Sequence, residues 1–491
     1  MDVQQSVSFE YKTPEQVCDR AEQLPGMTFR DVLDLGIYPK GVMREYNSRR
    51  YKGGMGNLLE ERFFGYRANS DREPDFAEAG VELKATCIDT RKDGRDVAGE
   101  RLVLTMIPYD EEFPTSLYDS HLWYKCHRML LVWYRRDRKR DPYDQEIAFT
   151  YLYEPPEADL RVMERDYRQI AELVRSGHAE DLSESLTTYL GACTKGATAA
   201  KSMRDQAMYA PGKLARARAF SLKRPYMDYV LHHYVMGTPE AESVAADPRE
   251  LERQGLERYV TSIINAHVGE SDRELCRMLD LEYTGNKAQW TTIAYRLLGV
   301  RGDRAVEFEK AGIRVRTIRP EPDGKRLVES APVLNIDFLA LAAEQDWEDS
   351  ELREYLSDMR YLFVVFQKEG ERTVLRGCKM WGMPVRDLDG PVRDCWERTR
   401  NAVVNGVTLT PKVSSKGRVS FSNDLPGISD GPVAHVRPRA ARAAYRFANG
   451  VEIGNVERDA EELPDGRWMT RQAFWLNSGY LLKQVAELLI N

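Results

Sequence analysis

A nine-residue pattern occurs twice in this chain, and the repeat restricts the folds that the chain can adopt. Residues 76–84 read Phe-x-x-Ala-Gly-Val-Glu-Leu-Lys, and residues 308–316 read Phe-x-x-Ala-Gly-Ile-Arg-Val-Arg. Neighbouring segments repeat in the same order, since residues 286–299 parallel residues 52–65. We therefore expect two tandem copies of one fold.

The chain is long enough for two such copies, because 491 residues with 42% hydrophobic side chains can supply two cores. We expect the first copy at residues 1–235 and the second at residues 257–491. Residues 236–256 are polar and contain Pro239 and Pro248, which is typical of a linker.

The local patterns predict both helices and strands. Thr13, Pro14 and Gln16 form a helix-start signal, with a capping box and proline in the first turn. A second helix is predicted over 57–64, after a glycine-rich turn. Strands are predicted around 80–88, 102–107, 128–134 and 147–153. This mixture predicts an α/β (mixed α+β) layer fold.

Two carboxylates and a lysine stand close together in the first copy, as Asp75, Glu82 and Lys84. Alternation along a strand places Glu82 and Lys84 on one side. Mg²⁺ prefers carboxylate oxygens, so Asp75 and Glu82 are its predicted ligands, with the carbonyl of Leu83 as a third. Lys84 would orient or help to deprotonate the water that attacks a phosphodiester.

Two further residues are candidates for the same site. Glu60, on the predicted helix before the motif, could hold a water at the metal or a second ion. Lys125 could offset charge near the scissile phosphate. Clustered carboxylates and lysines are also common on ordinary surfaces. A histidine base, His121 or His127, is a further alternative.

The second copy lacks this set of residues. Arg314 and Arg316 replace Glu82 and Lys84, Ala294 takes the place of Glu60, and Ser357 that of Lys125. A degenerate second site beside a complete first site is a specific combination. This combination makes a functional site in the first copy a better interpretation than a chance cluster of charges.

The net charge of −7 argues weakly against a nucleic-acid partner, but the distribution of charge argues for one. Residues 195–225 hold eight lysines and arginines against one acid, and residues 431–450 hold four arginines and no acid. The chain has seven cysteines without CxxC pairs, no apolar run long enough to span a membrane and no signal peptide, so a cytoplasmic protein is expected.

Together these residues resemble the MutH-type branch of the PD-(D/E)XK nucleases. That branch contains the mismatch-repair nickase MutH and the larger Sau-type restriction endonucleases that cut GATC. The resemblance is carried by residues 52–60, 75–84 and 120–125. It implies that Asp75 and Glu82 bind metal, that Lys84 is catalytic, and that Glu60 and Lys125 complete the site. It also implies a DNA contact for Lys52.

The same resemblance points to a base-reading loop late in each copy, where the nickase has Arg-Pro-Lys. The first copy departs from this pattern and keeps only Lys195. The second is closer, with Arg437, Pro438 and Arg439. In the Sau-type arrangement a catalytic domain is followed by a similar domain that binds DNA as an effector. Arginine or lysine to guanine is the expected readout.

We therefore expect a Mg²⁺-dependent Type II restriction endonuclease that makes double-strand cuts at GATC. Its second domain would bind another GATC site as an allosteric effector, so that one chain holds two sites on double-stranded DNA and could dimerise there. One alternative is a strand-specific repair nickase. The other, from a different class, is a non-catalytic DNA-tethering protein.

Overall fold

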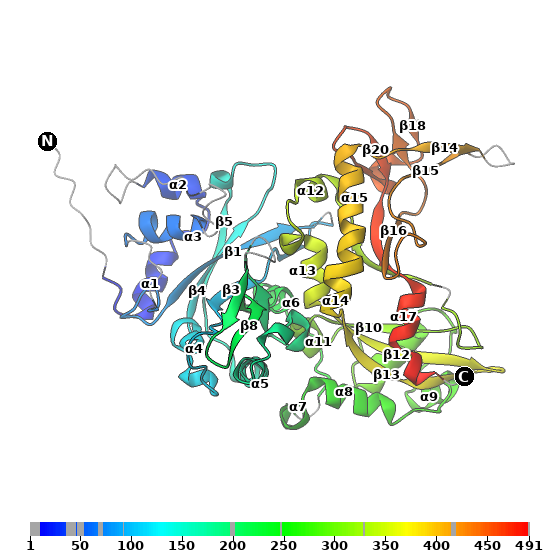
Figure 1. The fold of residues 1–491 in the computed structure, drawn as a ribbon, viewed down its shortest axis with the longest axis horizontal. Helices are drawn as coiled ribbons and strands as arrows, with labels where there is room; N and C mark the ends of the chain where they lie inside the picture. The colour runs from blue at the N-terminus through cyan, green and yellow to red at the C-terminus, as the bar shows by residue number, and fades with distance from the viewer. Residues whose placement is uncertain are drawn as a thin grey trace. The chain divides into compact units, whose positions relative to one another are not determined.

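The computed structural model describes residues 10–35, 46, 54–66, 72–91, 93–196, 202–245, 248–327, 329–413 and 419–489 (Figure 1). By its internal contacts the chain divides into two compact units. The first unit comprises Met1–Glu240 with Glu309–Ala311, and the second comprises Ala241–Phe308 and Gly312–Asn491.

Short helices open the first unit. Helix α1, Pro14–Ala21, begins at Thr13, whose side chain accepts from the backbone of Gln16, so the predicted capping box is confirmed. The predicted helix over 57–64 begins earlier than expected, at Gly54, and its second half is a π-helix. These segments are α2 Phe29–Asp34, α3 Gly54–Leu58 and η1 Leu59–Phe63.

Close packing explains the early helix start. A Cβ atom at Gly54 would lie 1.6 Å from the backbone oxygen of Tyr46. Only glycine therefore permits this approach of the two backbones, and the contact outweighs the low helix propensity of glycine. The expected start at residue 57 was wrong because this contact is tertiary.

The first unit is built on a four-stranded sheet in the order β2-β1-β4-β5. Strands β1 and β4 are parallel, and the other two pairings are antiparallel. The strands predicted around 80–88, 128–134 and 147–153 are confirmed, with small shifts at their ends. Their bounds are β1 Glu82–Thr90, β2 Asp96–Ala98, β4 Met129–Arg135 and β5 Ile147–Tyr153.

A second, antiparallel sheet of this unit has the order β3-β9-β6, and it includes the strand predicted at 102–107. The remaining elements of the unit are β3 Leu102–Met106, η2 Leu117–Asp119, α4 His121–Cys126, η3 Pro142–Asp144, α5 Glu157–Arg175, η4 Ala179–Asp181, η5 Glu184–Leu186, β6 Leu190–Thr194, β7 Met203–Gln206, β8 Ala210–Arg216, β9 Arg218–Leu222, α6 Arg224–Tyr229 and η6 Val230–Val235.

One hydrophobic cluster fixes the start of β1. It joins Leu83 of β1 and Leu130 of β4 to apolar side chains of α1, α2, α3 and η1. Because side chains alternate along a strand, burial of Leu83 against the helices sends Glu82 and Lys84 to the opposite side of β1.

The second unit also contains a parallel strand pair. Its sheet has the order β10-β12-β13, with β10 and β12 parallel and β12 and β13 antiparallel. A second sheet, β11-β21-β16, is antiparallel. Two smaller sheets have the orders β14-β15 and β18-β17-β20-β19. The strand bounds are β10 Ile313–Ile318, β11 Ala331–Asn335, β12 Arg360–Glu369, β13 Arg372–Gly382, β14 Thr410–Val413, β15 Val419–Ser422, β16 Ala434–Pro438, β17 Tyr445–Arg446, β18 Glu452–Ile453, β19 Ala460–Glu462, β20 Trp468–Thr470 and β21 Gln472–Leu476.

The helices after residue 240 complete the fold, and one of them lies in the segment predicted as a linker. They are α7 Pro248–Gln254, α8 Leu256–Asn265, α9 Asp272–Met278, α10 Gln289–Leu297, α11 Val306–Ala311, α12 Phe338–Ala343, η7 Trp347–Asp349, α13 Glu351–Asp358, α14 Val385–Asp387, η8 Leu388–Val392, α15 Arg393–Asn405, α16 Val456–Asp459, α17 Ser478–Gln484 and η9 Ala486–Leu488. The predicted mixed α/β class is confirmed. None of the described helices has the length and apolarity needed to cross a membrane.

Candidate active site

A tight loop brings Asp75 and Glu82 together. Phe76 and Val81 exchange two backbone hydrogen bonds, of 2.9 and 3.3 Å, which close the loop between them. Gly80 makes the turn with a φ of +64°, in the left-handed region that favours glycine. As a result the Asp75 N–H donates to Glu82 Oε2 at 3.2 Å, and the Leu83 N–H donates to Asp75 Oδ2 at 2.9 Å.

Both predicted lysines converge on Glu82. Lys84 Nζ donates to Glu82 Oε1 at 2.7 Å, and Lys125 Nζ lies 3.6 Å from the same oxygen. Lys125 is on α4, which ends just before β4, and parallel pairing sets Glu82 opposite Met129 at the start of that strand. The Glu82 side chain is only 3% exposed, so the three charges meet in a poorly solvated site.

Burial and crowding of negative charge change the protonation of the acids. Burial, followed by the charges of Asp75 and Glu82, raises the pKa of Glu60 to about 8. Burial and the charge of Glu82 raise the pKa of Asp75 to about 6, against the hydrogen bond from Leu83. The charges of the other two acids therefore act on Glu60, which holds a proton at neutral pH when no cation is present.

Burial acts on the pKa of the lysine in the direction opposite to its effect on the acids. Burial works to lower the pKa of Lys84, but the charge and hydrogen bond of Glu82 outweigh it, and the pKa is raised. Lys84 is therefore a protonated hydrogen-bond donor at neutral pH.

Tyr66 is a site residue that sequence reasoning missed. Burial, followed by the charges of Asp75, Glu60 and Glu82, raises its pKa well above the usual value. Its hydroxyl is buried and has no hydrogen-bond partner among the described residues. A lone tyrosine just after a helix gives no signal of such a role in the sequence.

The two histidines considered as alternatives are bound elsewhere. His121 Nε2 lies 2.9 Å from the carbonyl oxygen of Arg72, and His127 Nδ1 lies 2.9 Å from that of Trp123. These contacts favour a site that uses acids and lysines.

The donor set fits a divalent cation. Asp75 and Glu82 offer two adjacent carboxylates, and the carbonyl of Leu83 follows directly in the chain. Glu60, Asp75 and Glu82 do not form a group whose ligand atoms all lie within 4.8 Å of one another. Asp75 and Glu82, linked by the hydrogen bond from the Asp75 N–H, are therefore the two carboxylates placed as direct ligands.

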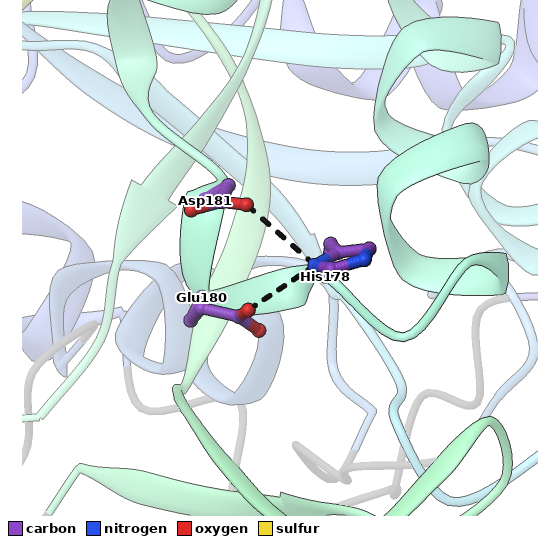
Figure 2. Close-up of side chains that lie close together, drawn as sticks. All are labelled: His178, Glu180 and Asp181. Atoms are coloured by element: carbon purple, nitrogen blue, oxygen red, sulfur yellow. Dashed lines mark hydrogen bonds and ion pairs between the residues drawn. The ribbon is translucent and has the colours of Figure 1, made fainter.

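In the part of the chain that the structure describes, one group of acids and a histidine has its ligand atoms all within 4.8 Å of one another (Figure 2). It consists of His178, Glu180 and Asp181, all exposed. Lys213 already occupies it, because its ammonium pairs with Glu180 and lies 3.2 Å from His178 Nδ1. A lysine inside the group takes the place that a cation would need.

Similarity to known proteins extends along the whole chain. The family model of the DNA mismatch repair enzyme MutH matches residues 64–166. The Type II restriction enzyme Sau3AI of Staphylococcus aureus is 33% identical over 508 aligned residues, covering 98% of this chain and 99% of that enzyme. The chain belongs to the MutH/Sau-type restriction endonuclease family.

Within this family the chain is about twice the length of a MutH protein. MutH of Shewanella woodyi is 26% identical over 220 residues, which are 45% of this chain and 91% of that protein. MutH of Escherichia coli is 28% identical over 227 residues, which are 46% of this chain and 94% of that protein. The MutH match at 64–166 contains Asp75, Glu82, Lys84 and Lys125, and Glu60 lies just before it.

The residues that the family resemblance suggested for DNA contact belong to both units. Lys195 follows β6 in the second sheet of the first unit and is partly exposed. Arg437 and Arg439 are exposed at the end of β16 in the second unit, with the Arg437 guanidinium 5.3 Å from the centre of the Trp475 ring. Lys52 lies outside the described residues.

Proposed function

We propose that this chain is a Type II restriction endonuclease that makes double-strand cuts at GATC with Mg²⁺. The observation that carries the proposal is the assembled set of Asp75, Glu82 and Lys84 in a chain that aligns with Sau3AI from end to end. A protein that only tethers DNA has no use for a cluster of acids whose pKa values are raised by burial and by each other's charge.

Mg²⁺ would be held by Asp75, Glu82 and the carbonyl of Leu83. Burial, followed by the charge of Glu82, raises the pKa of Asp75 although both lysines act to lower it, and a divalent cation would stabilise the charged form of this buried carboxylate. When bound, the ion would stabilise charge developing on the scissile phosphodiester.

The chain's own residues divide the remaining tasks. Protonated Lys84, held by Glu82, would donate a hydrogen bond that orients the attacking water, which favours orientation over deprotonation. Lys125 would lie beside the phosphate and offset its charge. Glu60, with a pKa raised to about 8, could accept a proton once positive charge enters the site.

We further propose that the second unit is a degenerate copy of the first and binds a second GATC site as an effector. The shared strand orders support this, because β10-β12-β13 repeats β1-β4-β5 and β11-β21-β16 repeats β3-β9-β6. Arg437 and Arg439 are exposed where base reading is expected. One chain would then hold two sites on double-stranded DNA, and dimerisation there would follow from site pairing.

Digestion of unmethylated plasmid DNA with Mg²⁺, followed by sequencing of the product ends, tests this function. Double-strand ends at GATC are expected, and a plasmid with two sites should be cut faster than one with a single site. Nicks without double-strand ends would support the nickase alternative. Binding without any cutting would support the tethering alternative.

A further inference from the structure

Two arginines in the second unit lie on one side of β10, the strand that corresponds to β1 in the repeated sequence. Arg314 and Arg316 are on β10, where they pair with Tyr361 and Phe363 of β12 in parallel register. In the first unit the same register pairs Glu82 with Met129 and Lys84 with Leu131. The acid and lysine of the catalytic strand are thus replaced by two permanent positive charges.

The surroundings of these arginines contain aromatic rings and another arginine. The Arg314 guanidinium lies 5.5 Å from the centre of the Tyr355 ring. Arg316 is partly buried, and the charge of Arg439 acts on it. Three arginines therefore share one region of the second unit, including one from the expected base-reading loop.

The positive charge of this region is not neutralised by an ion pair. Among the described residues, no carboxylate forms an ion pair with Arg314 or Arg316. Glu329, the acid whose charge acts on Arg316, is instead paired with Lys287. Burial, with Arg439 adding to it, lowers the pKa of Arg316. A partly buried guanidinium without an anion is costly, so a bound anion would be stabilising.

The one acid kept from the metal-binding motif is engaged elsewhere. Glu307 matches Asp75 in the repeated sequence. Its carboxylate accepts a hydrogen bond from Ser243 Oγ and another, of 3.0 Å, from the Val244 N–H. The region therefore has positive charge that can bind an anion. It lacks the motif carboxylate that would be needed to bind a cation.

We propose that Arg314 and Arg316 form a metal-independent binding site for a DNA backbone phosphate in the second unit. The inference rests on the proposed effector function and states how that DNA is held. The guanidinium pair would take the place that Mg²⁺ and its carboxylates hold in the first unit. Contacts to phosphate fix position without reading sequence, so Arg439 beside them would be left to contact bases.

The test uses the full-length chain and a labelled GATC duplex, with binding measured by fluorescence anisotropy in EDTA and in Ca²⁺. In EDTA the wild-type chain should bind one duplex through the second unit. The double variant Arg314→Gln, Arg316→Gln should weaken that binding by about tenfold or more. The slope of log affinity against log salt should become shallower by about 0.9 for each phosphate that is no longer neutralised. Affinity should fall by the same factor for GATC and for scrambled duplexes.

Three controls separate binding from folding and charge from geometry. Arg277→Gln removes an exposed arginine of α9 in the same unit and should leave affinity and salt slope unchanged. The double variant should melt at the same temperature as wild type or higher, because it removes a poorly solvated charge. Arg316→Lys should keep part of the wild-type affinity that the double variant loses, since the charge is kept and only the planar fork is removed.

The outcomes distinguish the two proposals. Unchanged affinity and salt slope in the double variant, with a second duplex still bound by wild type, would overturn the phosphate site alone. Loss of GATC preference without a general loss of affinity would also overturn it, because that result indicates base reading. If wild type binds only one duplex in Ca²⁺ and none in EDTA, the effector function fails and the phosphate site fails with it.

Discussion

At the scale of single residues, the proposed chemistry of the first unit depends on Glu82. It accepts hydrogen bonds from Lys84 and from the Asp75 backbone, and Lys125 lies close to the same carboxylate. Because the site is poorly solvated, these charges interact more strongly than they would on the surface. Removing one of these charges should therefore change cation binding, cleavage or the pH dependence of stability in a direction that can be measured.

Lys84→Ala should reduce cleavage at least about a hundredfold, since it removes the donor that orients the water. DNA binding in Ca²⁺ should remain nearly intact, and half-saturation by Ca²⁺ should occur at the same or a lower concentration, because Glu82 loses a competing cation. Plasmid cleavage and anisotropy measure the two effects. Lys12→Ala, at an exposed lysine of the same unit, is the matched control. Retained cutting in Lys84→Ala would remove this assignment.

Glu60 should make the stability of the metal-free protein depend on pH. Its pKa in the folded protein, about 8, is above its ordinary value of 4.5, so the folded state binds the proton more tightly than the unfolded state. The free energy of unfolding should therefore fall as pH rises through this interval, and Asp75 should add to the fall up to about pH 6.

Thermal melting in EDTA between pH 5 and 8 measures this dependence. Glu60→Gln should flatten it and raise the melting temperature at pH 8, whereas Glu22→Gln, at an exposed glutamate, should leave it unchanged. Divalent cations should bind more tightly as pH rises, since protons compete for the same carboxylates. A melting temperature that is independent of pH in the wild-type chain would contradict the assigned pKa values.

At the scale of elements, the geometry of the candidate site depends on the loop that precedes β1. Phe76, Val81 and Leu83 are buried in the cluster that packs α1, α2, α3 and η1 on the sheet. Their burial holds the loop over residues 76–81 closed, so that residues seven positions apart in sequence can share a hydrogen bond. The loop therefore positions the candidate site, although none of its side chains has a role in the proposed chemistry.

Gly80→Ala should cost about 1 kcal/mol, because the left-handed backbone strains any residue with a Cβ. An added Cβ would have nothing within 4 Å, so steric clash does not contribute. The strain should loosen the loop and raise the Ca²⁺ concentration needed for half-saturation. Gly80→Asn should lose less, since asparagine tolerates this conformation.

Gly56→Ala is the matched control for this loop, because it makes the same substitution in open space within helix α3. Alanine there should be neutral or stabilising. Chemical denaturation and a Ca²⁺ titration measure both properties. Equal effects of Gly80→Ala and Gly56→Ala would show that the turn does not control the site.

At the scale of the whole molecule, the proposed function assigns cutting to one unit and activation to the other. The family relationship covers the full chain, while MutH proteins match less than half of it. A second unit that was only a scaffold would not need exposed arginines at the end of β16. Its contribution should therefore be visible in substrates with two sites.

Replacing Arg437 and Arg439 together by alanine should weaken binding of the second duplex by about tenfold to a hundredfold, the range expected when hydrogen bonds to bases are removed. Cleavage of a two-site plasmid should slow to the rate seen with a one-site plasmid, because the effector is no longer bound. Arg277→Ala provides the control. Full activity of the double variant on two-site DNA would contradict the proposed effector function.

The sequence by itself determined the class of fold and the family, and it predicted Asp75, Glu82 and Lys84 as a candidate site, because spacing along a strand and after a turn is a local property. Glu60 and Lys125 were predicted through the family resemblance, since both are distant from the motif in sequence. It also predicted the capping box at Thr13. Only the tertiary structure showed that η1 begins from a helix started at Gly54 and that Tyr66 lies beside the acids. It also showed that Arg316 forms no ion pair with any described residue, since burial and contact arise between segments that are distant in the chain.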